Sequence, residues 1–212
     1  FHVLLQPGGP DTVETLYPEQ TELYLQPDRD SDIRIGFNAL DFVQVNSDIN
    51  RQMVAQALDL LELEAGLRTL DLFCGLGNFT LPLARRCAQV TGVEVDEAML
   101  RRARVAALAN GIENTEYFSA DLFKPDPEAD WMGQQYDRIL LDPPRSGAQE
   151  IAQLIGRFKA ERIVYVSCQP SSLVRDAAII CAQGYRMSQL GVMDMFPQTA
   201  HVEAMALFER VT

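Results

Sequence analysis

Long apolar runs, paired cysteines and an excess of basic residues are all missing from this 212-residue sequence. No apolar run approaches the roughly 18 to 20 residues that a membrane-spanning helix needs, and the first residues lack the charged and apolar regions of a secretion signal. We therefore expect a cytoplasmic protein that does not bind a membrane. The four cysteines form no CxxC pair, so the sequence predicts no metal site and no disulfide framework.

Acidic residues outnumber basic ones, and the formal net charge is −12. Residues 1–66 hold 12 acids and 3 bases, whereas residues 67–212 hold 18 acids and 15 bases. Affinity for phosphate depends largely on Lys and Arg, so the composition argues against sequence-independent binding of nucleic acid by this chain alone. A role on nucleic acid needs a local patch or a further module. With 47% hydrophobic and 23% charged residues the protein is globular, and we expect a monomer.

The pattern of apolar residues divides the chain into three parts. Short alternating stretches separated by turn signals predict a small antiparallel β subdomain over residues 1–46. Helical spacing after Ser47, a good N-cap, predicts a linking helix over residues 47–66. Over residues 67–212 apolar runs alternate with helical patterns, which indicates an α/β, Rossmann-like domain with helices on both faces of a mostly parallel sheet. The sequence begins without methionine inside a predicted strand, and we expect it to be part of a longer protein.

A glycine turn follows the first strand of the predicted α/β domain. Gly75 and Gly77 allow a ligand to approach the backbone at the carboxyl end of that strand, although a G-x-G alone is also typical of an ordinary tight turn. Glu94 ends the next strand, where a carboxylate can accept both hydroxyls of a ribose. The full G-x-G-x-x-G is absent, which favours S-adenosylmethionine over a dinucleotide. Asp121, after the third strand, is placed either to meet an adenine amino group or to cap a helix.

Three further segments place reactive groups at the same edge of the sheet. Asp142 opens the sequence DPPR directly after the fourth strand, and two prolines stiffen that turn. Cys168 lies at the tip of the fifth strand ahead of a predicted helix, whose N-terminal field is expected to lower the pKa of the thiol. Glu203 lies in a polar and aromatic segment before the last strand. The other cysteines, which we interpret as buried packing residues, are Cys74, Cys87 and Cys181.

Six motifs occur in a characteristic order. They are FVQVN at 42–46, LDLFCGLGNF at 70–79, VTGVE at 90–94, LDPPR at 141–145, VSCQP at 166–170 and DMFPQTAHVE at 194–203. In this order they resemble the RNA (uracil-5-)-methyltransferase family, and most closely its branch that acts on 23S ribosomal RNA. The resemblance implies an S-adenosylmethionine-dependent methyltransferase fold with a seven-stranded sheet whose last strand is antiparallel.

The resemblance also implies roles for individual residues. Cys168 matches the family's nucleophile and Glu203 its general base. The residues that it assigns to the methyl donor are Gln44, Phe73, Asn78, Glu94, Asp121 and Asp142, beside the glycine turn at Gly75. Family members carry an OB-like RNA-binding domain and, in this branch, a four-cysteine iron-sulfur cluster. Neither is encoded here, so the cluster is expected only in a preceding region, and residues 1–46 match the remnant of a central domain.

These residues suggest a covalent mechanism on a ribosomal RNA substrate. Uracil C5 is a poor nucleophile, so we expect the Cys168 thiolate to add to C6 and generate an enolate that accepts the methyl group. Glu203 then removes the C5 proton. Asp142 is expected to bind the uracil edge, and Arg145 to bind a neighbouring phosphate or orient Asp142. Phe196 is the aromatic side chain expected to hold a base that has left its stack.

Three other functions remain open from sequence. A transfer-RNA uracil-5-methyltransferase shares most of the motifs. Methylation of an amino group uses Asp-Pro-Pro followed by an aromatic residue, but position 145 is Arg and that chemistry needs neither Cys168 nor Glu203. A non-catalytic fragment that only binds S-adenosylmethionine is the third alternative.

Overall fold

The computed structural model describes residues 2–19, 22–29, 31–199 and 201–211, so Ala200 of the last motif lies outside the described residues. Its centre is a seven-stranded sheet with the order β10-β11-β9-β8-β5-β6-β7. The strands are β5 (Arg68–Leu72), β6 (Gln89–Glu94), β7 (Thr115–Ser119), β8 (Arg138–Leu141), β9 (Arg162–Ser167), β10 (Tyr185–Met193) and β11 (Glu203–Arg210). The last strand, β11, pairs antiparallel with both neighbours, while the pairs from β9 to β7 are parallel. The predicted fold class is confirmed.

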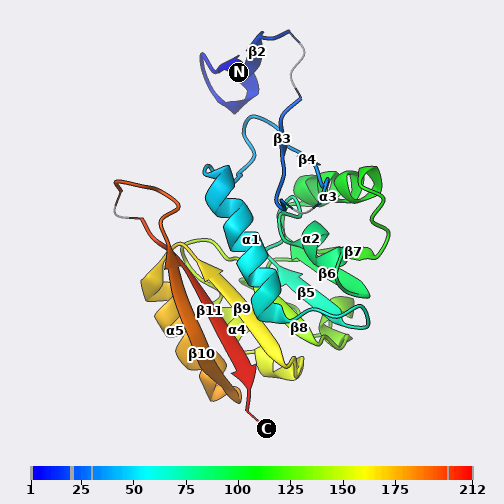
Figure 1. Cartoon of the computed structure of the whole chain (residues 1–212), viewed down its shortest axis with the longest axis vertical. Helices are drawn as coiled ribbons and strands as arrows, with labels where there is room; N and C mark the ends of the chain where they lie inside the picture. The colour runs from blue at the N-terminus through cyan, green and yellow to red at the C-terminus, as the bar shows by residue number, and fades with distance from the viewer. Residues whose placement is uncertain (1, 20–21, 30, 200, 212) are drawn as a thin grey trace.

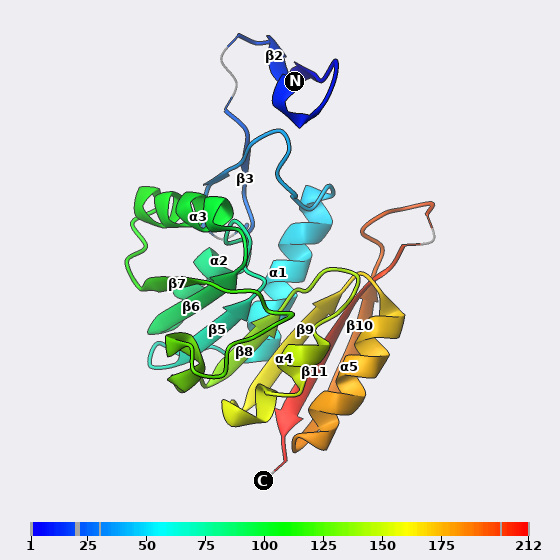
Figure 2. The same cartoon turned by 180° about the vertical axis from the view of Figure 1, so that it is seen from behind.

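Helices cover both faces of this sheet. They are α1 (Ser47–Leu61), α2 (Thr80–Ala84), α3 (Glu97–Ala109), α4 (Gln149–Ala152) and α5 (Pro170–Ala182), with short 3-10 turns at Pro10–Thr12, Asp130–Gly133 and Ile155–Arg157. Figure 1 shows α1, α2 and α3 on the near face, and Figure 2, seen from behind, shows α4 and α5 on the other. The alternation of strands and helices seen in the sequence therefore corresponds to three layers.

Residues that alternate along each central strand pack into different cores. In β9, Ile163 and Tyr165 face the α4 and α5 side, whereas Val164 and Val166 face α1. All four side chains are fully buried, and each contributes roughly 1.5–3 kcal/mol of burial free energy. Because both faces are covered, the carboxyl edge of the parallel strands is where a ligand can reach the sheet.

The linking helix α1 is shorter than predicted. Asn46, and not the expected Ser47, caps it by accepting a hydrogen bond from the Ile49 backbone N–H at 3.2 Å. Its apolar stripe, which includes Met53 and Leu58, packs onto the sheet. The helix ends after Leu61 because Glu62 adopts a left-handed conformation with φ 46°. Residues 62–66 therefore form a turn rather than the last turn of the helix.

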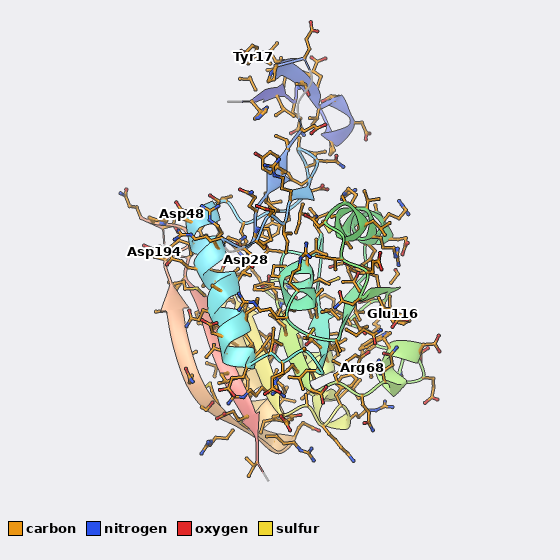
Figure 3. All side chains as sticks on the ribbon, turned by 45° about the vertical axis from the view of Figure 1, so that its right-hand side comes forward. Tyr17, Asp28, Asp48, Arg68, Glu116 and Asp194 are labelled. Atoms are coloured by element: carbon orange, nitrogen blue, oxygen red, sulfur yellow. The ribbon has the colours of Figure 1, made fainter. Side chains whose placement is uncertain are left out.

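The segment before α1 contains two separate two-stranded antiparallel sheets. Strands β3 (Tyr24–Leu25) and β4 (Ile35–Gly36) adjoin the body, where Ile35 is fully buried. Strands β1 (Val3–Leu5) and β2 (Glu14–Tyr17) form a hairpin that stands away from the sheet at the top of Figure 1. Figure 3 shows Tyr17 on this hairpin, and that side chain is 61% exposed. Among the described residues, no helix is long and apolar enough to cross a membrane.

Candidate active site

A cleft of about 490 Å³ opens at the carboxyl edge of the sheet. Its walls come from the segments that follow β5, β6, β7, β8 and β9, from residues 42–44, and from the first residue of β11. The predicted site residues that line it are Gln44, Phe73, Gly75, Asn78, Glu94, Asp121, Asp142, Arg145, Cys168 and Glu203. The fold thus gathers residues that are up to 159 positions apart in the sequence.

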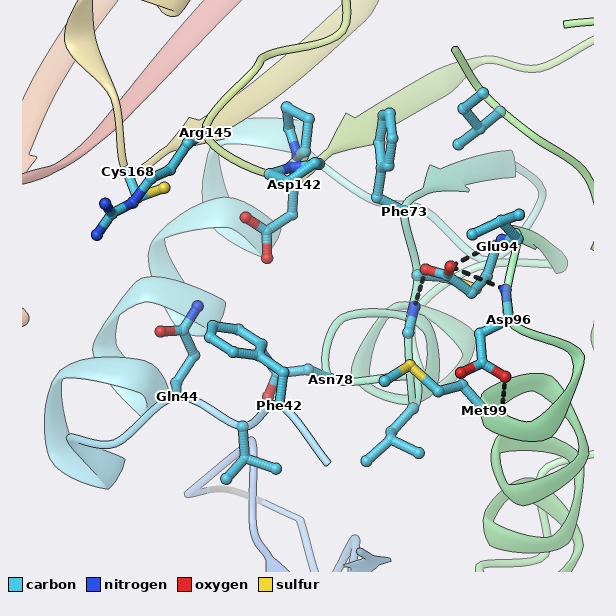
Figure 4. Close-up of a pocket in the computed structure, with 18 of the residues that line it drawn as sticks. Phe42, Gln44, Phe73, Asn78, Glu94, Asp96, Met99, Asp142, Arg145 and Cys168 are labelled. Carbon is cyan, nitrogen blue, oxygen red and sulfur yellow. Dashed lines mark hydrogen bonds between the residues drawn. The ribbon is translucent and has the colours of Figure 1, made fainter. Parts of the chain in front are cut away.

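The glycine turn and Glu94 form one end of this cleft. The Glu94 carboxylate accepts three backbone hydrogen bonds: Oε2 from Gly75 at 3.3 Å, and Oε1 from Val95 at 2.7 Å and Asp96 at 3.1 Å. The dashed lines in Figure 4 show these contacts. Gly75 has a φ of +52°, which favours glycine, and a side chain there would meet open space. A carboxylate offers about four acceptor positions, so Oε2 retains capacity for a ligand hydroxyl.

Asn78 is anchored by a second amide. Its Oδ1 accepts from Asn50 Nδ2 at 2.9 Å, and its own Nδ2 donates to Asn50 Oδ1 at 3.0 Å. Asn50 lies on α1 and is buried, so the pair connects that helix to the turn before α2. The sequence did not identify Asn50 as part of the site, because its partner lies 28 positions away.

The segment before α1 closes the cleft opposite the sheet. Gln44 points into the cavity in Figure 4, and its Oε1 is buried without a hydrogen-bond partner among the described residues. Asp41 anchors this segment to α3 through Arg102, with 2.7 Å between Oδ1 and Nη2. A buried acceptor without a donor is rare in a folded protein. The cleft therefore has a place for a ligand that donates a hydrogen bond.

The structure does not bear out the helix cap that the sequence offered for Asp121, and it leaves the contact with adenine as a prediction. Asp121 lines the cleft, and its Oδ1 also accepts the backbone N–H of Phe123 at 2.9 Å, which caps a turn and not a helix. The Phe123 ring lies 5.8 Å from the ring of Phe73, and both rings line the cavity beside Asp121. This part of the cleft is apolar with one carboxylate at its border.

Asp142, Cys168 and Glu203 form the other end of the cleft. Asp142 follows β8, and its carboxylate points into the cavity in Figure 4. Ala204 of β11 pairs with Ser167 of β9, so one further step of the same antiparallel register places Glu203 beside Cys168. Arg145 lies next to Cys168 in Figure 4. Two carboxylates, one thiol and one guanidinium therefore share a small volume.

Burial raises the pKa of each acid at this end. The pKa of Asp142 is raised to about 7, first by burial and then by the nearby Glu203. Burial also raises the pKa of Glu203, which is only 3% exposed, while Arg145 acts in the opposite direction. The pKa of Cys168 is raised by burial, then by Glu203 and Asp142, against a lowering by Arg145. The expectation of a lowered pKa for Cys168 is therefore wrong, because burial and two carboxylates raise it.

Two sequence expectations do not match the positions that the structure shows. Phe196 does not line the cleft; it packs against the core on the α1 side and its ring lies 6.0 Å from that of His201. Cys181 is exposed and not buried, whereas Cys74 and Cys87 are buried as expected. The aromatic residue that lines the cleft and remains 71% exposed is Phe42. It is part of the FVQVN motif, so the signal was present in the sequence. Within the described ranges, no three His, Cys, Asp or Glu residues gather as a metal site requires.

The comparison with known sequences identifies the family. A profile of the tRNA (Uracil-5-)-methyltransferase family matches residues 22–211. The chain belongs to this family. It is 54% identical over 214 residues to a protein of Hahella chejuensis named 23S rRNA (uracil(1939)-C(5))-methyltransferase RlmD, covering 98% of this chain and 48% of the relative. A protein of the same name from Xanthomonas axonopodis pv. citri is 49% identical, covering 99% of this chain and 47% of that protein. The chain spans about half the length of the curated relatives that it matches.

Solved structures show the same fold. The tRNA (uracil-54, C5)-methyltransferase of Pyrococcus abyssi, solved with S-adenosyl-L-homocysteine, matches with a TM-score of 0.73 and 28% identity, covering 89% of this chain and 44% of that one. The TYW2 protein of M. jannaschii, solved with AdoMet, matches with a TM-score of 0.66 at 17% identity, covering 94% of this chain and 91% of that one. The second likeness bears on the fold alone.

Proposed function

We propose that this chain catalyses transfer of a methyl group from S-adenosylmethionine to C5 of a uridine in 23S ribosomal RNA. The observation that carries the proposal is a single cleft with Cys168, Asp142 and Glu203 at one end and Glu94 with Gly75 at the other. The relatives named for 23S ribosomal RNA are 54% and 49% identical, whereas the solved tRNA enzyme is 28% identical. The higher identity favours ribosomal RNA as the substrate.

The residues present fit the methyl donor. Glu94 Oε2 has acceptor capacity for ribose hydroxyls, and the buried Oε1 of Gln44 lacks a donor among the described residues. Asp121 borders the apolar part of the cleft, where an adenine ring would pack against Phe73 and Phe123. When bound, S-adenosylmethionine supplies an electrophilic methyl group on a sulfonium sulfur.

Cys168 activates the uracil ring. Its thiolate adds to C6, forming a carbon–sulfur bond, and the electrons of the C5–C6 double bond move toward the C4 carbonyl oxygen, which makes C5 nucleophilic. Because the pKa of Cys168 is raised, the thiol must lose its proton as it attacks. The ionised form of the neighbouring Asp142 can accept this proton, which leaves Glu203 ionised for the later step, and Arg145 stabilises the thiolate charge.

Asp142 and Glu203 divide the remaining proton transfers. With a pKa of about 7, Asp142 carries a proton in a large share of molecules near neutral pH and can donate it to the uracil oxygen that gains charge. After methylation, Glu203 removes the C5 proton, the C6–sulfur bond breaks and the thiolate of Cys168 is restored. Burial raises the pKa of Glu203, and a more basic carboxylate is a better acceptor for that proton.

We assign to Phe42 the role of holding the target base, which the sequence analysis assigned to Phe196. The target base must leave its stack to reach Cys168. An exposed aromatic face at the cleft compensates for part of that cost, since stacking on an aromatic side chain contributes about 1–3 kcal/mol per base. Phe42 has such a face, whereas Phe196 packs on the core.

RNA that contains 5-fluorouridine tests this proposal. Fluorine at C5 cannot leave as a cation, so the enzyme should remain covalently attached after methyl transfer. We expect a denaturant-stable complex that requires S-adenosylmethionine and whose crosslink maps to Cys168 by mass spectrometry. The exposed Cys181 offers a matched control, because Cys181→Ala should form the complex normally.

The same assay separates the possible substrates. Parallel reactions use a 23S ribosomal RNA fragment and a transfer RNA. A complex on transfer RNA alone would overturn the ribosomal assignment. A crosslink at another residue, or methyl transfer without any adduct, would overturn the covalent mechanism.

A further inference from the structure

A buried carboxylate behind the catalytic end of the cleft joins three structural elements. Asp176 lies on α5 and is fully buried. Its Oδ2 accepts hydrogen bonds from the hydroxyl of Tyr165 on β9 at 2.6 Å and from the backbone N–H of Ala148 at 2.7 Å. Its Oδ1 accepts Nε of Arg175 at 2.8 Å. Asp176 does not line the cleft, and the mechanism above does not use it.

These bonds hold the segment that carries Arg145. Besides contacting Asp176, Arg175 donates through Nη2 to the carbonyl of Ser146 at 2.8 Å. The segment is thus fixed at Ser146 and at Ala148, directly after Arg145 and the two prolines. It cannot shift without breaking bonds to a charged carboxylate, which are stronger than neutral hydrogen bonds.

Asp176 also fixes the strand that carries the thiol. Tyr165 lies three residues before Cys168 on β9, and α5 begins two residues after Cys168. The bond between Tyr165 and Asp176 therefore spans the turn that contains Cys168. The Asp176 carboxylate therefore contacts both the strand before Cys168 and the segment after Arg145.

The packing around Gly147 shows how tightly this junction is built. Gly147 has a φ of +79°, and a Cβ at this position would lie 2.4 Å from Asp176 Oδ2 and 2.6 Å from Arg175 Nη2. Only glycine fits between the loop and α5 without displacing the carboxylate. The loop after β8 therefore packs directly against α5 at Gly147.

We propose that Asp176 is a positioning residue that sets the distance between the Arg145 guanidinium and the Cys168 thiol. This inference rests on the proposed function, because the proposed methyl transfer is what gives Arg145 and Cys168 a catalytic role. Asp176 touches neither the RNA nor the methyl donor; it acts through Tyr165, Ala148 and Arg175.

Two substitutions and one control test this role in the full chain. Asp176→Asn keeps an oxygen for Tyr165 and Ala148 but places an amide N–H₂ against the Arg175 guanidinium, which frees the loop at Ser146. Tyr165→Phe removes one hydroxyl and keeps the ring. Tyr185→Phe is the matched control, because its hydroxyl is also buried and donates to the Ala160 carbonyl at 2.9 Å, before β9 begins and away from the cleft.

The readout is the pH dependence of Cys168 alkylation by iodoacetamide, followed on its own peptide by mass spectrometry with the exposed Cys181 as internal reference. The charged groups that act on Cys168 are Glu203 from β11 with Asp142 and Arg145 from the loop after β8. When Arg145 moves away, the two carboxylates remain, so the alkylation midpoint should shift upward by about half a unit in Asp176→Asn and Tyr165→Phe. Tyr185→Phe should keep the wild-type midpoint.

Turnover should change in the same order. A misplacement of about 1 Å can cost about 100-fold in rate, so we expect kcat of Asp176→Asn to fall about 100-fold and that of Tyr165→Phe about tenfold. Affinity for S-adenosylhomocysteine, measured by calorimetry, should stay within about twofold, because Glu94 and Gly75 lie at the other end of the cleft.

The outcomes separate this inference from the proposed function. If Asp176→Asn fails to fold, Tyr165→Phe and Tyr185→Phe decide the matter. A wild-type alkylation profile in folded Tyr165→Phe would overturn the positioning role, as would an equal shift in Tyr185→Phe. If the wild-type chain transfers no methyl group to RNA, the proposed function fails, while the alkylation profiles still decide the role of Asp176.

Discussion

The two ends of the cleft use the same chemical group in different ways. Glu94 ends a central strand, and three backbone N–H groups hold its carboxylate as an acceptor. Asp142 and Glu203 lie at the same edge of the sheet, but there burial and mutual repulsion raise the pKa of Asp142, and burial raises that of Glu203. All three residues carry a carboxylate at the same edge of the sheet. The number of backbone N–H donors nearby and the degree of burial therefore decide whether a carboxylate binds a ligand or transfers protons.

Removal of the thiol is the strongest way to separate the two ends. Cys168→Ala should abolish methyl transfer to RNA, because no other described residue at that end is a thiol that can add to C6. Affinity for S-adenosylhomocysteine should remain within about twofold, since Glu94 and Gly75 are unchanged. Turnover assays and calorimetry measure the two effects. Retained turnover, or a large loss of affinity, would show that the two ends are not independent.

Glu203→Gln should give the next largest effect. An amide cannot remove the C5 proton, so turnover should fall by about 10²–10⁴-fold. Because the steps before proton removal need no base at C5, a methylated protein–RNA adduct should accumulate. Denaturing gels with radiolabelled methyl donor measure the adduct. Normal product release by this variant would remove Glu203 from the role of base.

Glu94→Gln should affect binding more than turnover. The amide N–H₂ must face at least one backbone N–H that the carboxylate accepted, which removes a charge-assisted hydrogen bond. We expect about 10- to 100-fold weaker binding of S-adenosylhomocysteine. At saturating methyl donor, kcat should fall by less than about tenfold. A variant with normal affinity and a low kcat would contradict the division of the cleft.

The smallest expected effect is on stability. The pKa of Asp142 in the folded protein, about 7, lies above its ordinary value of 3.8. The folded state therefore binds more protons than the unfolded state between these values, and the free energy of unfolding should decrease as the pH rises from about 4 to about 7. Asp142 is partly solvated, so its share is on the order of 1 kcal/mol.

Asp142→Asn isolates that share. Urea unfolding at several pH values should show a weaker decline for the variant than for the wild-type protein. The decline should not vanish, because burial also raises the pKa of Asp71, under the glycine turn, to about 7. If the stability of Asp142→Asn declines with pH as steeply as that of the wild-type protein, the pKa of Asp142 in the wild-type protein is not raised.

Local patterns were sufficient to predict most of the fold. Strand and helix alternation predicted the α/β class, and Ser47 at the start of an apolar helical stripe predicted α1. The end of α1 was missed, because the left-handed turn at Glu62 has no glycine to signal it. The described residues before α1 form two small sheets, which short alternating stretches could not separate.

Electrostatic properties were harder to predict. The pKa of Cys168 was expected to fall, since the sequence shows the following helix but does not show that Glu203 lies beside the thiol. Phe196 was assigned to the target base for its position in a motif, yet its side chain packs on the core. In both residues the deciding neighbours are distant in sequence.

The sequence by itself determined the order of strands and helices, the position of every motif after FVQVN at the end of a strand, and the resemblance to one family. These properties depend on neighbours within a few residues or on motif order. Only the tertiary structure decided that β11 lies between β9 and β10 and sets Glu203 opposite Cys168. It also decided that Asp176 joins the loop after β8 to β9 and that the pKa of Asp142 is raised to about 7. Burial, strand pairing and the charges around a group arise from contacts between distant segments, and those contacts exist only once the chain has folded.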